Sequence, residues 1–347
     1  MQSSKKPFGQ IDKALSRKVS VFYILALLAS VFILLTSFFY KGWAFVIVCP
    51  GYYGGLLVPP LHGKVAVVTG FSDSSVIRQL VYDLVLSGAH CVVTARFKED
   101  GEEMLANIKQ KRLKDVNIGK LDVAIVDMGS PKSIERFATK FRRNFFFDSL
   151  DYLILNGDIF TWQFKETVNG IESIFAHNYL GQFLLTKLLL GKVKSSKTRI
   201  LVMINYAYRL SYQSGIAFET LRSNRTFSAV HAYGQSKVAM AHFSYELSRR
   251  LKGSGATSNT VYPGLVTDSF ISEKSWVYGQ NLFASMSSVS GAVTLLAVAV
   301  SEKFLTVNGK HIEPPGIVFP NPPSLQINTT LAARLWRKSL SLSGQFF

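Results

Sequence analysis

Tyr233 and Lys237 are the two side chains in this sequence best suited to proton transfer. They are four residues apart at the head of an amphipathic segment, roughly His231 to Leu251, which predicts a helix with both side chains on one face. An ammonium group one turn from a phenol favours the phenolate, so such a tyrosine can exchange a proton with an alcohol or carbonyl oxygen near neutral pH. The same lysine can also hydrogen-bond a ribose. Taken alone, the spacing more often marks a helix face that carries both residues by chance.

The segments that must position this pair alternate between short apolar runs and helical patterns. Strand-like runs fall at residues 64–70, 89–95, 121–126, 150–155, 200–204 and 257–262, with helical patterns at 76–86, 130–143, 170–190 and 232–251. Apolar strands that alternate with helices are typical of a parallel sheet covered on both faces. We therefore predict an α/β fold with a Rossmann-like, doubly wound parallel sheet.

Ligands of such sheets bind beyond the carboxyl ends of the strands. Five residues that could contact a ligand stand at those ends: Gly70, Arg96, Asp127, Asn156 and Asn205.

The first 61 residues predict a membrane anchor. Residues 1–18 form a basic tail, and residues 19–40 carry no charge over a length that crosses a hydrocarbon core of about 30 Å as a helix. After Lys41, residues 42–61 are again uncharged and could form a second, broken span or lie in the interface, where Trp and Tyr settle. A cleaved signal or a buried helix is the alternative. The predicted organisation is a tail (1–18), an anchor of one span or a hairpin (19–61), a Rossmann domain (62–313) and a C-terminal wrap (314–347).

The composition bounds the partners of the chain. Its 347 residues carry 39 Lys and Arg against 22 Asp and Glu, a formal charge of +17. A basic balance favours anionic partners such as lipid head groups or a phosphorylated cofactor. The sequence has no nucleic-acid-binding motif, and its histidines and two cysteines lack metal-ligand spacing, so we predict no nucleic-acid partner and no metal. Membrane lipid is the expected partner, in the endoplasmic reticulum or the mitochondrial inner membrane.

Several motifs in a fixed order resemble the short-chain dehydrogenase/reductase family, most closely its membrane-anchored, retinol dehydrogenase-like branch. The resemblance runs from about Leu61 to Leu342. The matching stretches are Gly63–Gly70, Gly88–His90 with Arg96, Asn178–Thr186, Ala232–Lys237, Tyr262–Gly264 and Arg334–Trp336.

The resemblance implies roles for individual residues. Tyr233 would be the catalytic acid or base and Lys237 its partner, Asn178 would help to hold a proton-relay water, and Asn205 stands where the family has its catalytic serine. An arginine at the end of the second strand resembles the family's device for a ribose 2′-phosphate, so Arg96 implies NADP rather than NAD. The residues expected at the cofactor are Gly70, Ser72, Arg96, Asp127, Asn156, Tyr233, Lys237, Pro263 and Gly264.

The sequence also departs from the family pattern at the cofactor turn and at the serine. Ser74 and Val76 replace two glycines that let backbone approach the pyrophosphate, and Asp73 adds a negative charge nearby. The turn at residues 155–158 is altered as well. An asparagine at position 205 can donate a hydrogen bond to a carbonyl oxygen but cannot share a mobile hydroxyl proton.

Two functions therefore remain open. The first is a membrane-anchored NAD(P)-dependent oxidoreductase acting on a lipophilic alcohol or ketone, retinoid-, steroid- or lipid-like. Survival of Tyr233, Lys237 and Asn178 favours it, and four aromatic residues suit an apolar substrate: Phe270, Trp276, Tyr278 and Phe283. The second is an inactive member without cofactor, a structural or regulatory subunit of a membrane complex, which the lost glycines and serine favour.

Overall fold

The computed structural model describes residues 58–112, 117–144, 147–264 and 288–344. Within these ranges, no helix combines the length and the apolar character needed to cross a bilayer. The span predicted at residues 19–40 lies outside the described residues, as do the aromatic residues predicted between positions 270 and 283.

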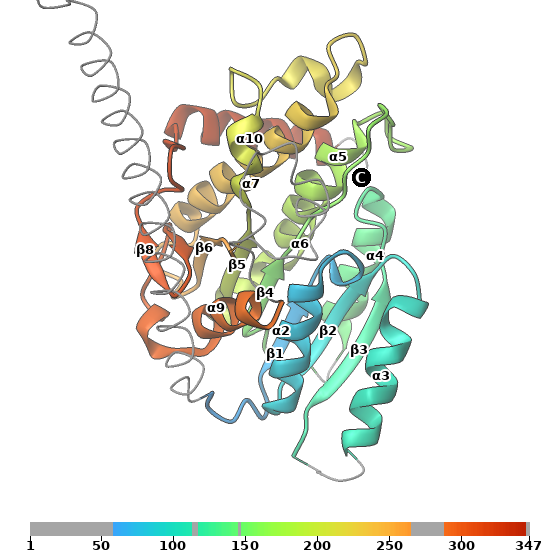
Figure 1. Ribbon diagram of the computed structural model, residues 1–347, viewed down its shortest axis with the longest axis vertical. Coiled ribbons are helices and arrows are strands. Elements are labelled where there is room, and N and C mark those ends of the chain that lie inside the picture. The colour runs from blue at the N-terminus through green and yellow to red at the C-terminus, as the bar shows by residue number, and fades with distance from the viewer. Residues whose placement is uncertain (1–57, 113–116, 145–146, 265–287, 345–347) are drawn as a thin grey trace, which may run out of the picture. The chain divides into compact units, whose positions relative to one another are not determined.

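The described residues form one eight-stranded sheet in the order β3-β2-β1-β4-β5-β6-β7-β8 (Figure 1). The first seven strands are parallel, and β8 pairs with β7 in the antiparallel sense. This confirms the predicted doubly wound sheet and adds β7 and β8, which the sequence did not predict. The strands are β1 (Val65–Val68), β2 (His90–Ala95), β3 (Lys120–Ile125), β4 (Tyr152–Leu155), β5 (Arg199–Met203), β6 (Thr257–Val261), β7 (His311–Glu313) and β8 (Ile317–Phe319).

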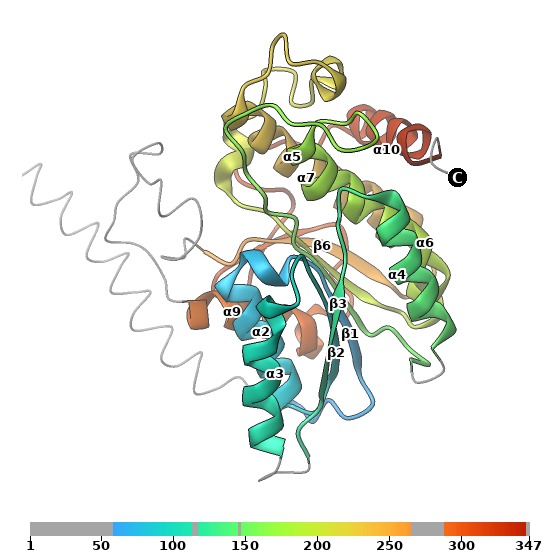
Figure 2. The same ribbon diagram turned by 90° about the vertical axis from the view of Figure 1, so that its right-hand side faces the viewer.

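Helices cover both faces of this sheet. Figure 2 shows α2, α3 and α9 on one face and α4, α6 and α7 on the other. Their bounds are α2 (Ser75–Leu86), α3 (Glu99–Arg112), α4 (Pro131–Arg143), α6 (Gly181–Ser195), α7 (Ala229–Arg250) and α9 (Ser288–Val300). Because both faces are covered, the central strands are buried throughout, which explains their continuous apolar sequences.

The helix predicted over residues 170–190 is interrupted. It begins as a short α-helical turn, α5 (Ser173–Phe175), continues as a π-helical turn, η2 (Ala176–Leu180), and then becomes α6. The carboxylate of Glu172 caps the start, accepting from the amides of Ile174 (2.6 Å) and Phe175 (2.9 Å). π-Helical turns inside helices occur frequently at functional sites.

A C-terminal helix, α10 (Thr329–Gly344), packs against α7 and completes the core on that side (Figure 1). Trp336 is 7% exposed, and its ring meets Phe183 edge-on at 5.0 Å between centroids. The hydroxyls of Tyr179 and Ser339 are hydrogen-bonded at 2.6 Å. The helix is thus part of the domain's interior packing.

Candidate active site

A small cavity lies at the carboxyl ends of β1, β2 and β4. Its volume is about 30 Å³. Four of the residues predicted at the cofactor line it, namely Gly70, Ser72, Arg96 and Asn156. The fold therefore brings these four residues, which follow three strands, to the edge where α/β sheets bind ligands.

The turn after β1 fits closely against the end of β4. Gly70 has a left-handed backbone (φ +69°), and a Cβ at this position would lie 1.9 Å from the carbonyl oxygen of Asn156. The hydroxyl oxygen of Thr69 accepts from the Asn156 amide (2.9 Å) while its proton goes to Gln182 Oε1 (2.8 Å). Glycine is therefore required at position 70 by both conformation and space.

Ser74 and Val76, which stand in place of two glycines of the family, have different surroundings at the start of α2. Ser74 is the N-cap residue, and its hydroxyl accepts from the Ile77 amide at 3.3 Å. That amide is one of the groups that a helix N-terminus can offer to a phosphate, so the cap competes with an anion for it. Val76 is 3% exposed within α2 and is not among the residues that line the cavity.

A hydrogen bond between the Ser72 side chain and the Arg96 backbone joins the turn after β1 to the turn after β2. Ser72 Oγ accepts from the Arg96 amide (3.0 Å), and the Ser72 carbonyl accepts from Arg78 Nη1 (3.1 Å). The Arg96 guanidinium lies 5.8 Å from the centre of the Phe97 ring, at the cavity rim. A cation at this rim is suited to an anionic group such as a phosphate.

The remaining predicted cofactor residues lie near this edge without lining the cavity. Asp127 Oδ1 accepts from the Gly129 amide (2.8 Å) and lies 3.1 Å from His177 Nε2. Pro263 and Gly264 directly follow β6. Nothing in their geometry assigns them a contact with the cavity.

Tyr233, Lys237 and Asn205 meet beside the cavity. Tyr233 and Lys237 project from α7 and are 3% and 2% exposed. Asn205 follows β5 and caps the next turn, its Oδ1 accepting from the Ala207 amide at 3.1 Å. Its Nδ2 donates to the Tyr233 oxygen at 2.8 Å. The asparagine in the serine position therefore does reach the tyrosine.

Asn178 fastens the chain after β4 to the π-helical turn. Its Oδ1 accepts from the Ile159 amide (2.8 Å), and its Nδ2 donates to the Ile159 carbonyl (3.0 Å) and to Ser236 Oγ (3.2 Å). The side chain is completely buried. In this arrangement Asn178 positions both the loop after β4 and the first turns of α7.

Asp158 is a member of this side-chain cluster that the sequence analysis did not predict. The Tyr233 hydroxyl donates to its Oδ1, and Lys237 Nζ lies 2.7 Å from the same oxygen and 2.6 Å from the Gly157 carbonyl. The sequence indicated only that the 155–158 turn was altered. An acidic residue at the carboxyl end of a strand, in a fold that also buries a lysine there, is the signal that could have identified it.

Aromatic side chains border Tyr233. The Phe160 ring lies 5.7 Å from the Tyr233 ring, and Trp162, which is 53% exposed, lies 4.9 Å from Phe160. Phe227 packs against the same cluster. The sequence placed the apolar surface after position 264, whereas these residues supply one before it.

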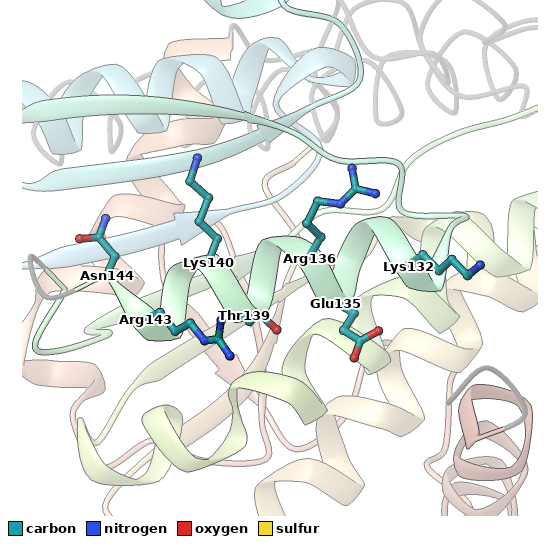
Figure 3. A pocket seen from close by; sticks show the side chains of 7 residues that line it. All are labelled: Lys132, Glu135, Arg136, Thr139, Lys140, Arg143 and Asn144. Carbon is teal, nitrogen blue, oxygen red and sulfur yellow. The ribbon is translucent and has the colours of Figure 1, made fainter.

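A larger cavity, of about 660 Å³, is lined by α4 and by the residue that follows it (Figure 3). It contains none of the predicted site residues. Its lining is Lys132, Glu135, Arg136, Thr139, Lys140, Arg143 and Asn144. Because long solvent-facing side chains of one helix enclose it, we assign the chemistry to the smaller cavity, where buried polar groups converge.

A doubly wound sheet with a tyrosine, a lysine and an amide at its carboxyl edge defines a short-chain oxidoreductase type of site. The sequence model of the family described as short chain dehydrogenase matches residues 64–276, and the chain belongs to this family. Within it, the chain falls in the retinol dehydrogenase-like branch. It is 32% identical over 290 residues to human retinol dehydrogenase 11, covering 82% of this chain and 87% of that relative.

The chain is also similar to short-chain dehydrogenases that are not named as retinol dehydrogenases. The chloroplastic short-chain dehydrogenase TIC 32 B of Brassica napus is 31% identical over 292 residues, covering 80% of this chain and 88% of the relative. A solved short chain dehydrogenase of Burkholderia cenocepacia in complex with NADP has a TM-score of 0.57 at 18% identity, over 76% of this chain and 98% of that one. At this identity the second likeness supports the fold alone.

The family uses NAD or NADP, and this site fits such a dinucleotide only in part. The left-handed turn at Gly70 and the cation of Arg96 suit the phosphate end. At the other end, Asp158 already uses the donors of Tyr233 and Lys237. A bound ribose would need the Lys237 ammonium group as a hydrogen-bond donor, and the Asp158 carboxylate already accepts from that group.

Proposed function

We propose that this protein is a membrane-anchored, NADP-dependent oxidoreductase that interconverts a lipophilic alcohol and its ketone. The observation that carries the proposal is the meeting of Tyr233, Lys237 and Asn205 at one edge of the cavity. A sheet can bury a tyrosine and a lysine anywhere, but a tyrosine and a lysine suited to proton transfer, with an amide donor beside them at the ligand edge, support catalysis. The relatives named retinol dehydrogenases support the same class of substrate.

In this mechanism the nicotinamide, when bound, supplies or accepts the hydride. Tyr233 exchanges the proton of the substrate oxygen through its hydroxyl. Asn205 Nδ2 donates one hydrogen bond to the phenol oxygen at 2.8 Å, and its second N–H would donate to the substrate oxygen. Lys237, with its ammonium 4.9 Å from the centre of the Tyr233 ring, supplies a positive charge that stabilises the developing phenolate.

The aromatic cluster of Phe160, Trp162 and Phe227 supports an apolar substrate. It lies beside the tyrosine that would act on the substrate oxygen, and part of it is solvent-exposed. A retinoid-, steroid- or lipid-like molecule would cover this surface while its oxygen reached Tyr233.

Turnover by the purified full chain tests this function. In detergent micelles with NADPH, we expect reduction of apolar ketones or aldehydes above the rate without protein, and no reduction of small polar ones. A chain that neither binds dinucleotide nor turns over any of these substrates would contradict the proposal and favour the alternative below.

Cofactor preference should depend on Arg96. We expect tighter binding of NADPH than of NADH, and expect Arg96→Ala to reduce the preference by about 1.5–3 kcal/mol, since a charge-assisted hydrogen bond to the 2′-phosphate is lost. Titration of both cofactors against parent and variant measures this. Arg136→Ala, at an exposed position of α4, serves as the control. Equal affinity for both cofactors in the parent would refute the role of Arg96.

The anchor should hold the full chain in the membrane as an integral protein. Because residues 19–40 are uncharged over a spanning length, we expect alkaline carbonate to leave the full chain in the membrane pellet. A shortened chain beginning near His62 should be released. Extraction of the full chain would refute integral attachment. We place the protein in the endoplasmic reticulum or the mitochondrial inner membrane, with membrane lipid as its partner.

A second function is favoured by two specific observations. Asp158 neutralises Lys237, and Asn205 replaces the serine, so an inactive member that serves as a subunit of a membrane complex is the alternative. In that case the chain would bind no dinucleotide and would co-purify with stable membrane partners.

A further inference from the structure

One oxygen atom accepts hydrogen bonds from both side chains on which the proposed activity depends. Asp158 Oδ1 accepts from the Tyr233 hydroxyl and from Lys237 Nζ, the latter at 2.7 Å. A ribose hydroxyl that reached Lys237 beside Tyr233 would have to stand where this oxygen stands. We propose that the Asp158 carboxylate fills the position that the cofactor ribose would take. A dinucleotide therefore binds only after it displaces this carboxylate. The inference rests on the proposed function and deepens it.

The difference in burial indicates which partner moves. The Lys237 side chain is 2% exposed, whereas that of Asp158 is 18% exposed and lines the cavity. Lys237 also keeps a second acceptor, the Gly157 carbonyl at 2.6 Å, when Asp158 leaves. A buried ammonium stays where it has an acceptor, so the carboxylate is the group that rotates away.

The backbone around Asp158 confines the movement to its side chain. Asn178 clamps the next residue, Ile159, through both its amide and its carbonyl. On the other side, a Cβ on Gly157 would lie 2.4 Å from Asn178, so this backbone is packed directly against the π-helical turn. With both neighbours fixed, rotation of the Asp158 side chain away from Lys237 is the available route.

The same carboxylate controls the proton of Tyr233. Asn205 donates to the phenol oxygen, and the phenol proton is directed to Asp158 rather than toward a substrate. Displacement of Asp158 therefore frees the ammonium and the phenol proton together. This coupling predicts an order of binding in which dinucleotide precedes the alcohol or ketone.

The test measures dinucleotide affinity with NADPH as the probe and the full chain in detergent. Asp158→Ala should bind NADPH at least tenfold more tightly than the parent, because no carboxylate competes for Lys237. Asp158→Asn, which keeps the volume but lacks the charge, should fall between the two. NADPH-dependent thermal unfolding gives a second readout of the same order, independent of turnover.

A matched control stands at the opposite end of the same strand. Asp151 precedes β4 and pairs with Lys64 at 2.9 Å, as Asp158 follows β4 and pairs with Lys237. Asp151→Asn should leave NADPH affinity unchanged. A gain in this variant equal to that of Asp158→Asn would mean that the effect is one of general charge, and would overturn the proposal.

The outcomes separate this inference from the proposed function. Tighter NADPH binding in folded Asp158→Ala supports the inference, whether or not either protein turns over substrate. Unchanged or weaker binding in folded Asp158→Ala and Asp158→Asn overturns it, even where the parent is an active reductase. If Asp158→Ala fails to fold, Asp158→Asn alone decides by the same criterion. Weaker binding with reduced turnover would instead make Asp158 a participant in catalysis.

Discussion

Tyr233→Phe should reduce turnover by about 10²–10⁴-fold, because the substitution removes the only atom of this side chain that can exchange a proton. The Tyr233 hydroxyl accepts a hydrogen bond from Asn205 Nδ2 at 2.8 Å and donates one to Asp158, and the variant loses both. The volume changes little, and folding and NADPH affinity should stay close to those of the parent. Steady-state reduction of an apolar ketone, with cofactor titration beside it, measures both effects.

A tyrosine on the same helix provides the matched control. Tyr245 lies in α7, three turns beyond Tyr233 and away from the cavity. Tyr245→Phe should keep the parent's turnover. Near-parental turnover in Tyr233→Phe would show that the acid–base assignment is wrong.

The largest effect on stability is expected from Trp336→Ala. The ring lies 5.0 Å from Phe183 and 6.1 Å from Phe243, with the Arg250 guanidinium 4.3 Å from its centre. Truncating a buried aromatic residue removes its apolar burial and leaves a cavity, at a cost of about 3–5 kcal/mol. Denaturant unfolding of a chain that begins near His62 measures the change, provided that the shortened parent unfolds reversibly.

An exposed neighbour on the same helix distinguishes packing from loss of helix propensity. Lys338 lies two residues further along α10 and is exposed. Lys338→Ala should change the free energy of unfolding by no more than about 0.5 kcal/mol. If Trp336→Ala unfolds at the same denaturant concentration as Lys338→Ala, then α10 does not contribute to the core as described.

The sheet could be predicted from sequence because four of its strands, β1, β2, β4 and β5, are almost wholly buried and read as mainly apolar runs. Short or polar elements could not. β7 and β8 have three residues each, too few to show a period. α3 carries acidic residues in its first turn and mostly exposed side chains, so its sequence lacks an apolar face. It is held close to the sheet at Gly101, where a Cβ would lie 2.5 Å from Val123.

The residues of the candidate site also differ in how far the sequence could predict them. Gly70, Ser72, Arg96 and Asn156 could be placed together because each follows a strand, and parallel strands end at one edge. Asp158 was harder to assign a role, since its partners come from a helix 75 and 79 residues further along the chain, and only its place after a strand pointed to it. The interruption of the 170–190 helix was also hidden, because α-helical and π-helical turns share the same apolar residues.

The packing of α10 on the core has a consequence for the time at which the domain becomes complete during synthesis. Ser339 and its partner Tyr179 are 160 residues apart in the chain. At a translation rate of 5–20 residues per second, roughly 8–32 s pass between their synthesis. During this interval the aromatic surface around Phe183 has no cover from α10. The nascent chain should therefore attract chaperones that recognise apolar surface until α10 has emerged from the ribosome.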